Sequence, residues 1–156
     1  MTGSRLEKCQ RNFERKLISM PVEPKSRNTV VPGTLDAEDI SYVINSCYRL
    51  QSAIAANNFE KGWRDPEAPH RNFGELISLI HSETSEALEA FRDGDDCTEI
   101  SYEDDGKPVG VASELADVII RVLDMADEMN IPVIEAVIAK HRYNQTRPYR
   151  HGGKKI

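Results

Sequence analysis

The sequence has no long hydrophobic run and only three cysteines, and each shortage excludes a class of protein. No stretch reaches the roughly 18 uncharged apolar residues of a membrane-spanning helix, so the chain is not expected to cross a membrane. The cysteines, Cys9, Cys47 and Cys97, are too isolated for a disulfide framework or a zinc site. The first residues carry charge where a secretory signal has its apolar core, so we expect a cytoplasmic protein.

The chain also has no glycine-rich phosphate loop of the GxxxxGK[ST] type, which excludes the P-loop class of nucleotide-binding proteins. Its 156 residues and 17.6 kDa suit one domain of ordinary size. With 39% hydrophobic and 29% charged residues, the composition is that of a globular protein.

The charges are unevenly distributed along the chain. Between Ser82 and Asn130 there are fifteen Asp or Glu against three Lys or Arg, whereas from Ile131 to the end there are six Lys or Arg against Glu135 alone. Charge blocks of this kind usually form solvated helix faces and trailing tails. Only the spacing of the charged residues can distinguish such a face from a binding site.

Apolar periodicity predicts four helices after an N-terminal arm or linker at residues 1–35, in which Leu6 to Ile18 could form a short helix. The main domain is expected to span residues 36–156. The four helices are predicted at residues 36–57, 72–92, 112–129 and 132–146.

Between the second and third helices, the Asp105-Gly106 pair separates two short extended runs and predicts a small β-hairpin within residues 95–110. The expected fold is therefore all-α, a four-helix core with a short β-hairpin or ordered loop. Apolar side chains of the second, third and fourth helices are expected to face that core, among them Leu88, Phe91, Leu115, Ile119 and Val137.

Two pairs of carboxylates stand three residues apart, Glu83 with Glu86 and Glu114 with Asp117. Residues at i and i+3 share a helix face, so packing the two helices antiparallel would gather four like charges that need a cation. Oxygen ligands of this kind suit Mg²⁺, with Mn²⁺ as an alternative, bound together with substrate phosphate. The alternative is that these acids only face solvent, as Glu128 farther along the third helix is expected to do.

Basic and aromatic residues supply a complementary set of candidates. Lys140, Asn144 and Arg147 share one face of the last helix, which Tyr149 continues, and the two cations suit phosphate. The loop before the second helix contains Lys61 and, two residues later, Trp63, which is the only Trp of the chain. Its indole either stacks on a base or fills the core.

Together these motifs resemble the MazG-like all-α nucleotide pyrophosphohydrolases. The resemblance is carried by Glu83-Thr84-Ser85-Glu86, by Glu114-Leu115-Ala116-Asp117 and by the Lys140 to Tyr149 segment, and it covers about residues 36–156. It is closest to the small single-domain type often carried by phages, which would work in the host cytoplasm. Many members have a third Glu where this chain has Ser82.

The resemblance implies hydrolysis of a nucleoside triphosphate, preferentially a deoxynucleotide, to the monophosphate and pyrophosphate. Metal would be held by Glu86, Glu114 and Asp117, with Glu83 as a further ligand or as the residue that activates water. Glu83 and Glu86 are thus the candidate catalytic residues. Phosphate, sugar or base would be bound by residues of the loop and the last helix: Lys61, Trp63, Lys140, Asn144, Arg147 and Tyr149. Relatives build the pocket between the helices of a dimer or tetramer, so a homodimer or homotetramer is expected.

Other functions stay open at this point. Within the enzyme class they are a strict dUTP or dCTP hydrolase and a hydrolase of guanosine alarmones such as ppGpp. Outside it, a non-catalytic helical module would bind a protein partner through the acidic face. A nucleic-acid partner is not expected, because the strongly negative middle of the chain opposes binding to a polyanion.

Overall fold

A computed structural model describes residues 34–65, 67 and 71–148. The chain divides into two units, residues 1–41 and 42–156. In the first unit the described part contains Asp36, whose Oδ1 accepts from the backbone N–H groups of Glu38 and Asp39 at 2.8 Å and caps the following helix. Nearly all of the predicted arm and its short helix lie outside the described residues.

The described residues form four helices and one two-stranded antiparallel sheet, which confirms the all-α fold with a hairpin between its second and third helices. None of these helices is both long enough and apolar enough to span a bilayer. In chain order the elements are α2 (Ala37–Glu60), α3 (Phe73–Asp93), β1 (Ser101–Tyr102), β2 (Pro108–Val109), α4 (Val111–Met129) and α5 (Val133–Gln145).

Helix α2 extends three residues beyond the predicted end. It closes where Gly62 adopts φ +80°, a left-handed conformation that side chains disfavour. The N–H of Trp63 donates to the carbonyl of Asn58 and that of Gly62 to the carbonyl of Phe59, which is the Schellman arrangement of a helix C-terminus. The closure places Lys61 and Trp63 at the end of α2.

Helix α3 is bounded by clear local signals. Asn72 and Glu75 form a reciprocal capping box at its start, each side chain accepting from the other's backbone N–H. Gly94, at φ +98°, ends it in the left-handed conformation. The position of the Glu83–Glu86 pair on α3 is thus set by sequence-local interactions at both ends.

The hairpin leads directly into α4. Ser101 pairs with Val109 and Tyr102 with Pro108, and β2 contacts α4. The connecting turn contains Gly106 at φ +86° and carries Lys107. Because β2 ends two residues before α4 begins, the hairpin lies beside the helix turn that carries Glu114.

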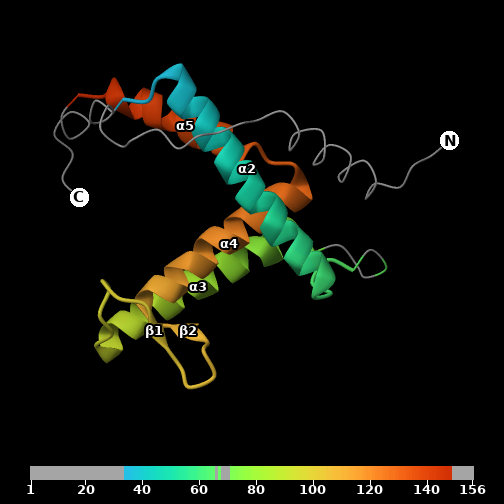
Figure 1. Cartoon of the computed structure of the whole chain (residues 1–156), viewed down its shortest axis with the longest axis vertical. Helices are drawn as coiled ribbons and strands as arrows, with labels where there is room; N and C mark the ends of the chain where they lie inside the picture. Colours follow the sequence, from blue (N-terminus) through green and yellow to red (C-terminus); the bar gives the residue numbers. More distant parts are fainter. Residues whose placement is uncertain (1–33, 66, 68–70, 149–156) are drawn as a thin grey trace. The chain divides into compact units, whose positions relative to one another are not determined.

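Helices α3 and α4 pack side by side and form the main tertiary contact of residues 42–148 (Figure 1). Leu76 and Ala87 of α3 and Leu123 and Ala126 of α4 are buried. This packing places the Glu83–Glu86 pair of α3 and the Glu114–Asp117 pair of α4 on two adjacent helices.

The prediction that all apolar stripes face a core was wrong for part of each helix. The exposed side chains include five of those expected inside, Leu88, Phe91, Leu115, Ile119 and Val137. The reason is geometric, since a stripe that covers a wide arc of a helix cannot be buried whole against one neighbouring helix. The described residues therefore present several large apolar side chains to solvent.

Candidate functional site

Three of the four predicted carboxylates converge between α3 and α4. One ligand oxygen from each of Glu83, Glu114 and Asp117 lies within 4.8 Å of the others, an arrangement that could hold a metal ion. Glu83 is only 5% exposed, whereas Glu114 and Asp117 are half-buried. Their donor set is oxygen only, as Mg²⁺ and Mn²⁺ prefer.

The fourth carboxylate, Glu86, lies one helix turn from Glu83 and is exposed. Its Oε1 accepts a hydrogen bond from Ser82 Oγ at 2.9 Å, which orients this side chain. The negative charge of Glu86 reaches both acids of α4, where it raises their pKa values. Both acids of α3 thus act on both acids of α4.

This mutual repulsion is visible in the pKa values of the α4 acids. Partial burial, then Glu86, Asp117 and Glu83, raise the pKa of Glu114 above its ordinary value. Burial and Glu83 raise the pKa of Asp117, while the charge of Arg121 works in the opposite direction. Crowded carboxylates with raised pKa values are the environment in which a bound cation is most favourable.

Two basic residues near the acids were missed by the sequence analysis. Arg121 Nε donates to Glu83 Oε1 in a short ion pair, and Lys107 of the hairpin turn acts at longer range to lower the pKa of both α4 acids. Arg121 follows Asp117 by four residues, so its place on the same face was open to prediction. Lys107 was not predictable, because its approach depends on the path of the hairpin.

The candidate phosphate-binding residues of α5 form a group of their own. The Lys140 ammonium and the Arg147 guanidinium each lie 5.9 Å from the centre of the Tyr143 ring, within the range of cation–π attraction. Lys140 and Asn144 line a shallow depression along the same helix. The sequence analysis also assigned Tyr149 to this group, but that residue lies outside the described part of the chain.

The structure does not join these groups to the carboxylates within one chain. Among the residues it describes, no hydrogen bond or ion pair connects α5, Lys61 or Trp63 with the four acids. Trp63 is 71% exposed, which excludes the core-filling alternative and leaves its ring free to stack.

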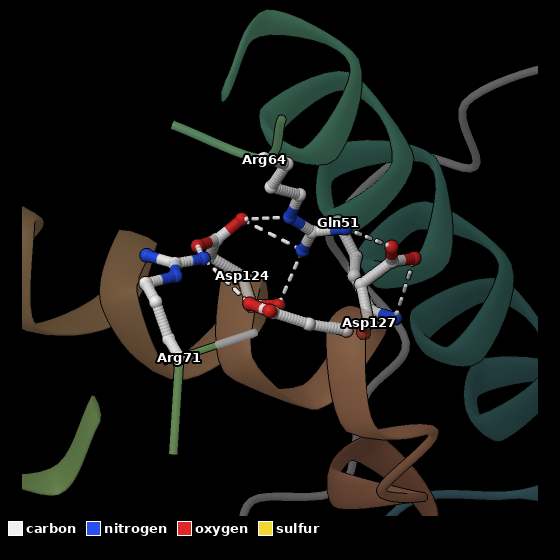
Figure 2. Close-up of polar contacts among 6 residues, drawn as sticks. Gln51, Arg64, Arg71, Asp124 and Asp127 are labelled. Carbon is white, nitrogen blue, oxygen red and sulfur yellow. Dashed lines mark hydrogen bonds and ion pairs between the residues drawn. The ribbon is translucent and has the colours of Figure 1, made fainter. Parts of the chain in front are cut away.

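A second acidic group on α4 forms an ion-pair network that the sequence analysis did not foresee (Figure 2). Arg64 Nε donates to Asp124 Oδ1 at 2.9 Å and its Nη1 to Asp127 Oδ2 at 2.7 Å. Arg71 Nη2 donates to Asp124 Oδ2 at 2.8 Å and to Glu128 Oε2 at 2.6 Å. Glu128, expected to be a surface acid without partners, is thus half-buried and paired.

The network fixes the connection between α2 and α3 on α4. Asp124 is only 3% exposed, and burial alone would raise its pKa. Hydrogen bonds from Arg71 and Asn58, together with the arginine charges, outweigh burial and bring the pKa of Asp124 below its ordinary value. Gln51 adds a weaker bond to Asp127 at 3.4 Å, so α2 also contributes.

Comparisons of the chain with protein-family models, with curated proteins and with solved structures find no match. The case for a function therefore rests on the residues and on their geometry.

Proposed function

We propose that this protein is a metal-dependent hydrolase of nucleoside triphosphates that releases the monophosphate and pyrophosphate. The observation that carries the proposal is the convergence of Glu83, Glu114 and Asp117, with Glu86 close by, in a cluster that has too few cations of its own. The resemblance to the MazG-like pyrophosphohydrolases supports the substrate class and a preference for deoxynucleotides.

The four carboxylates fit Mg²⁺, or Mn²⁺ in its place, by the chemistry of their donors. Glu86, Glu114 and Asp117 would hold the ion, which supplies positive charge for the phosphate oxygens. Glu83, which is buried and paired with Arg121, would be a further ligand or would orient or deprotonate a water molecule. Ser82 keeps Glu86 in position through its hydrogen bond.

The residues outside the carboxylate cluster are assigned to the substrate. Lys140 and Arg147 would bind phosphate through charge-assisted hydrogen bonds, and Asn144 phosphate or sugar. Lys61 and the exposed Trp63 would contact phosphate and base respectively. Tyr149 retains the substrate-binding role that the resemblance implies. A nucleotide substrate of this kind is found in the cytoplasm.

A homodimer or homotetramer belongs to the same proposal. Two facts support it, namely the exposed apolar side chains on α3 and α4 and, within the described part of the chain, the absence of a hydrogen bond or ion pair between α5 and the carboxylates. Monomeric proteins rarely leave contiguous apolar surface exposed. Assembly would cover this surface and would allow one chain to complete the site of another.

The decisive experiment is a substrate panel with the full chain. All common NTPs and dNTPs, and ppGpp in a separate reaction, are incubated with Mg²⁺. Pyrophosphate is detected as phosphate after treatment with inorganic pyrophosphatase, and the nucleotide product is identified by chromatography. We expect monophosphate and pyrophosphate, no turnover in EDTA, and recovery with Mg²⁺ or Mn²⁺.

Each alternative has its own outcome in this assay. Turnover that persists in EDTA would disprove the metal assignment. Release of phosphate with a nucleoside diphosphate would show that a different phosphate bond is cleaved. Turnover restricted to ppGpp would favour the alarmone hydrolase. A chain inactive on every nucleotide would favour the partner-binding module.

A further inference from the structure

Arg121 occupies a special place in the carboxylate cluster. It is the only basic side chain among the described residues that makes an ion pair with any of the four acids. Its partner, Glu83, is 5% exposed, while the Arg121 side chain is 38% exposed. A buried ionised carboxylate needs such a partner, because its desolvation is otherwise very costly.

The helix geometry also places Arg121 next to Asp117 of the cluster. It stands one turn after Asp117, and residues at i and i+4 are neighbours on a helix surface. The positive charge of Arg121 acts on Asp117 as well as on Glu83, since it offsets part of the rise in the pKa of Asp117 that burial and Glu83 cause. One guanidinium therefore serves two of the four acids.

The net charge of the cluster depends on Arg121 and on the number of divalent cations that it binds. Four ionised carboxylates with one arginine leave three negative charges, so one divalent cation leaves a single negative charge. A second divalent cation would make the cluster positive and would lie close to the guanidinium. At these separations, like charges repel by several kcal/mol even at an effective dielectric constant of about 20.

We propose that Arg121 is a built-in counter-ion of the carboxylate cluster, which takes the place of a second metal ion and limits the site to one divalent cation. The inference rests on the metal site of the proposed function, but it does not depend on which substrate is hydrolysed. It predicts that loss of the Arg121 charge increases the affinity of the cluster for cations. A residue that only held Glu83 in place would give the opposite result, because its loss would disorder a ligand.

The test is Mn²⁺ binding to the full chain without nucleotide, followed by electron paramagnetic resonance and by calorimetry. The variants are Arg121→Gln, which keeps a hydrogen-bond donor but removes the charge, and Arg121→Lys, which keeps the charge. Arg49→Gln removes a charge from an exposed position of α2 and is the matched control. Circular dichroism checks that each variant is folded.

We expect one Mn²⁺ per wild-type chain. Arg121→Gln should bind the first ion at least about tenfold more tightly, or take up a second ion, as expected when a like charge is removed from the site. Arg121→Lys and Arg49→Gln should behave as wild type. If Arg121→Gln unfolds, Arg121→Lys decides the question, since a charge role predicts wild-type binding and a role specific to the guanidinium predicts weaker binding.

Two Mn²⁺ ions on the wild-type chain, unchanged or weaker binding by folded Arg121→Gln, or no Mn²⁺ binding at all would overturn the counter-ion role. The nucleotide panel separates this failure from that of the proposed function. Triphosphate hydrolysis without tighter binding by Arg121→Gln rejects only the counter-ion. Tighter binding without hydrolysis of any nucleotide keeps the counter-ion and rejects the proposed reaction.

Discussion

Helix α4 carries two groups of acidic side chains whose charges are balanced very differently. In its second half, Asp124, Asp127 and Glu128 accept hydrogen bonds from two arginines, and the pKa of Asp124 is lowered. In its first half, Glu114 and Asp117 lie with two acids of α3 and one directly paired arginine, and their pKa values are raised. The same residue types thus stabilise the fold in one place and oppose it in the other.

The difference separates a structural role from a functional one. Acids that are neutralised by the protein's own arginines need no ligand, and their removal leaves the arginines without counter-charges. Acids that repel one another reduce stability unless a cation is bound, and crowded acids of this kind are candidates for a functional site. Substitutions in the two groups should therefore have opposite effects on activity and stability.

Neutral substitutions in the first group should abolish most activity without reducing stability. Glu86→Gln and Asp117→Asn are each expected to lower kcat at least about 10²-fold, the scale of losing a preorganised electrostatic group. Asp117→Asn should not destabilise the metal-free chain, because the charge that it removes is unfavourable there. Steady-state kinetics and urea unfolding in EDTA measure both effects. Near-normal turnover in both variants would assign these acids to a solvated face.

The opposite result is expected in the second group. Asp124→Asn should reduce the free energy of unfolding by about 3 kcal/mol, because it leaves Arg64 and Arg71 without their shared, buried counter-ion. The control is Glu128→Gln, which breaks only a more exposed pair and should cost about 1 kcal/mol or less. Urea unfolding of the three proteins gives the comparison, and equal stability of wild type and Asp124→Asn would contradict it.

The cations of α5 are expected to affect substrate binding more than stability. Lys140→Ala or Arg147→Ala should lower kcat/KM by one to two orders of magnitude, as for a loss of roughly 1.5–3 kcal/mol of charge-assisted hydrogen bonding. Arg142→Gln, exposed on another side of the same helix, is the matched control. A fully active Lys140→Ala, Arg147→Ala double variant would remove α5 from the mechanism.

The contribution of Asp124 should depend on pH in a defined direction. Its pKa in the folded protein is lowered, so the stabilisation is complete above the unfolded value of about 4 and disappears as the pH falls through the folded value. The stability difference between wild type and Asp124→Asn should therefore be full at pH 7 and smaller at about pH 3. Urea unfolding at both pH values measures it. A difference that stays constant would show that charge is not the cause.

Local sequence signals were sufficient for much of the fold. The helix periods, the capping Asn72, the terminating Gly94 and the Asp105-Gly106 turn each act over a few residues, and the structure has helices and a hairpin where they predict them. The carboxylate pairs were predictable for the same reason, since a spacing of three fixes a shared helix face. Their convergence, which the structure shows for Glu83, Glu114 and Asp117, needed only the antiparallel packing of two helices.

The sequence by itself therefore determined the helices, the hairpin and which acids share a face, because these depend on neighbours along the chain. Only the tertiary structure decided which acids are neutralised, because Arg64 and Arg71 reach Asp124 across 60 and 53 positions of sequence. It also decided that Leu88, Phe91, Leu115 and Ile119 stay exposed, since burial depends on what else packs against a stripe and not on the stripe itself. Charge balance and burial are properties of distances in space, which no local pattern encodes.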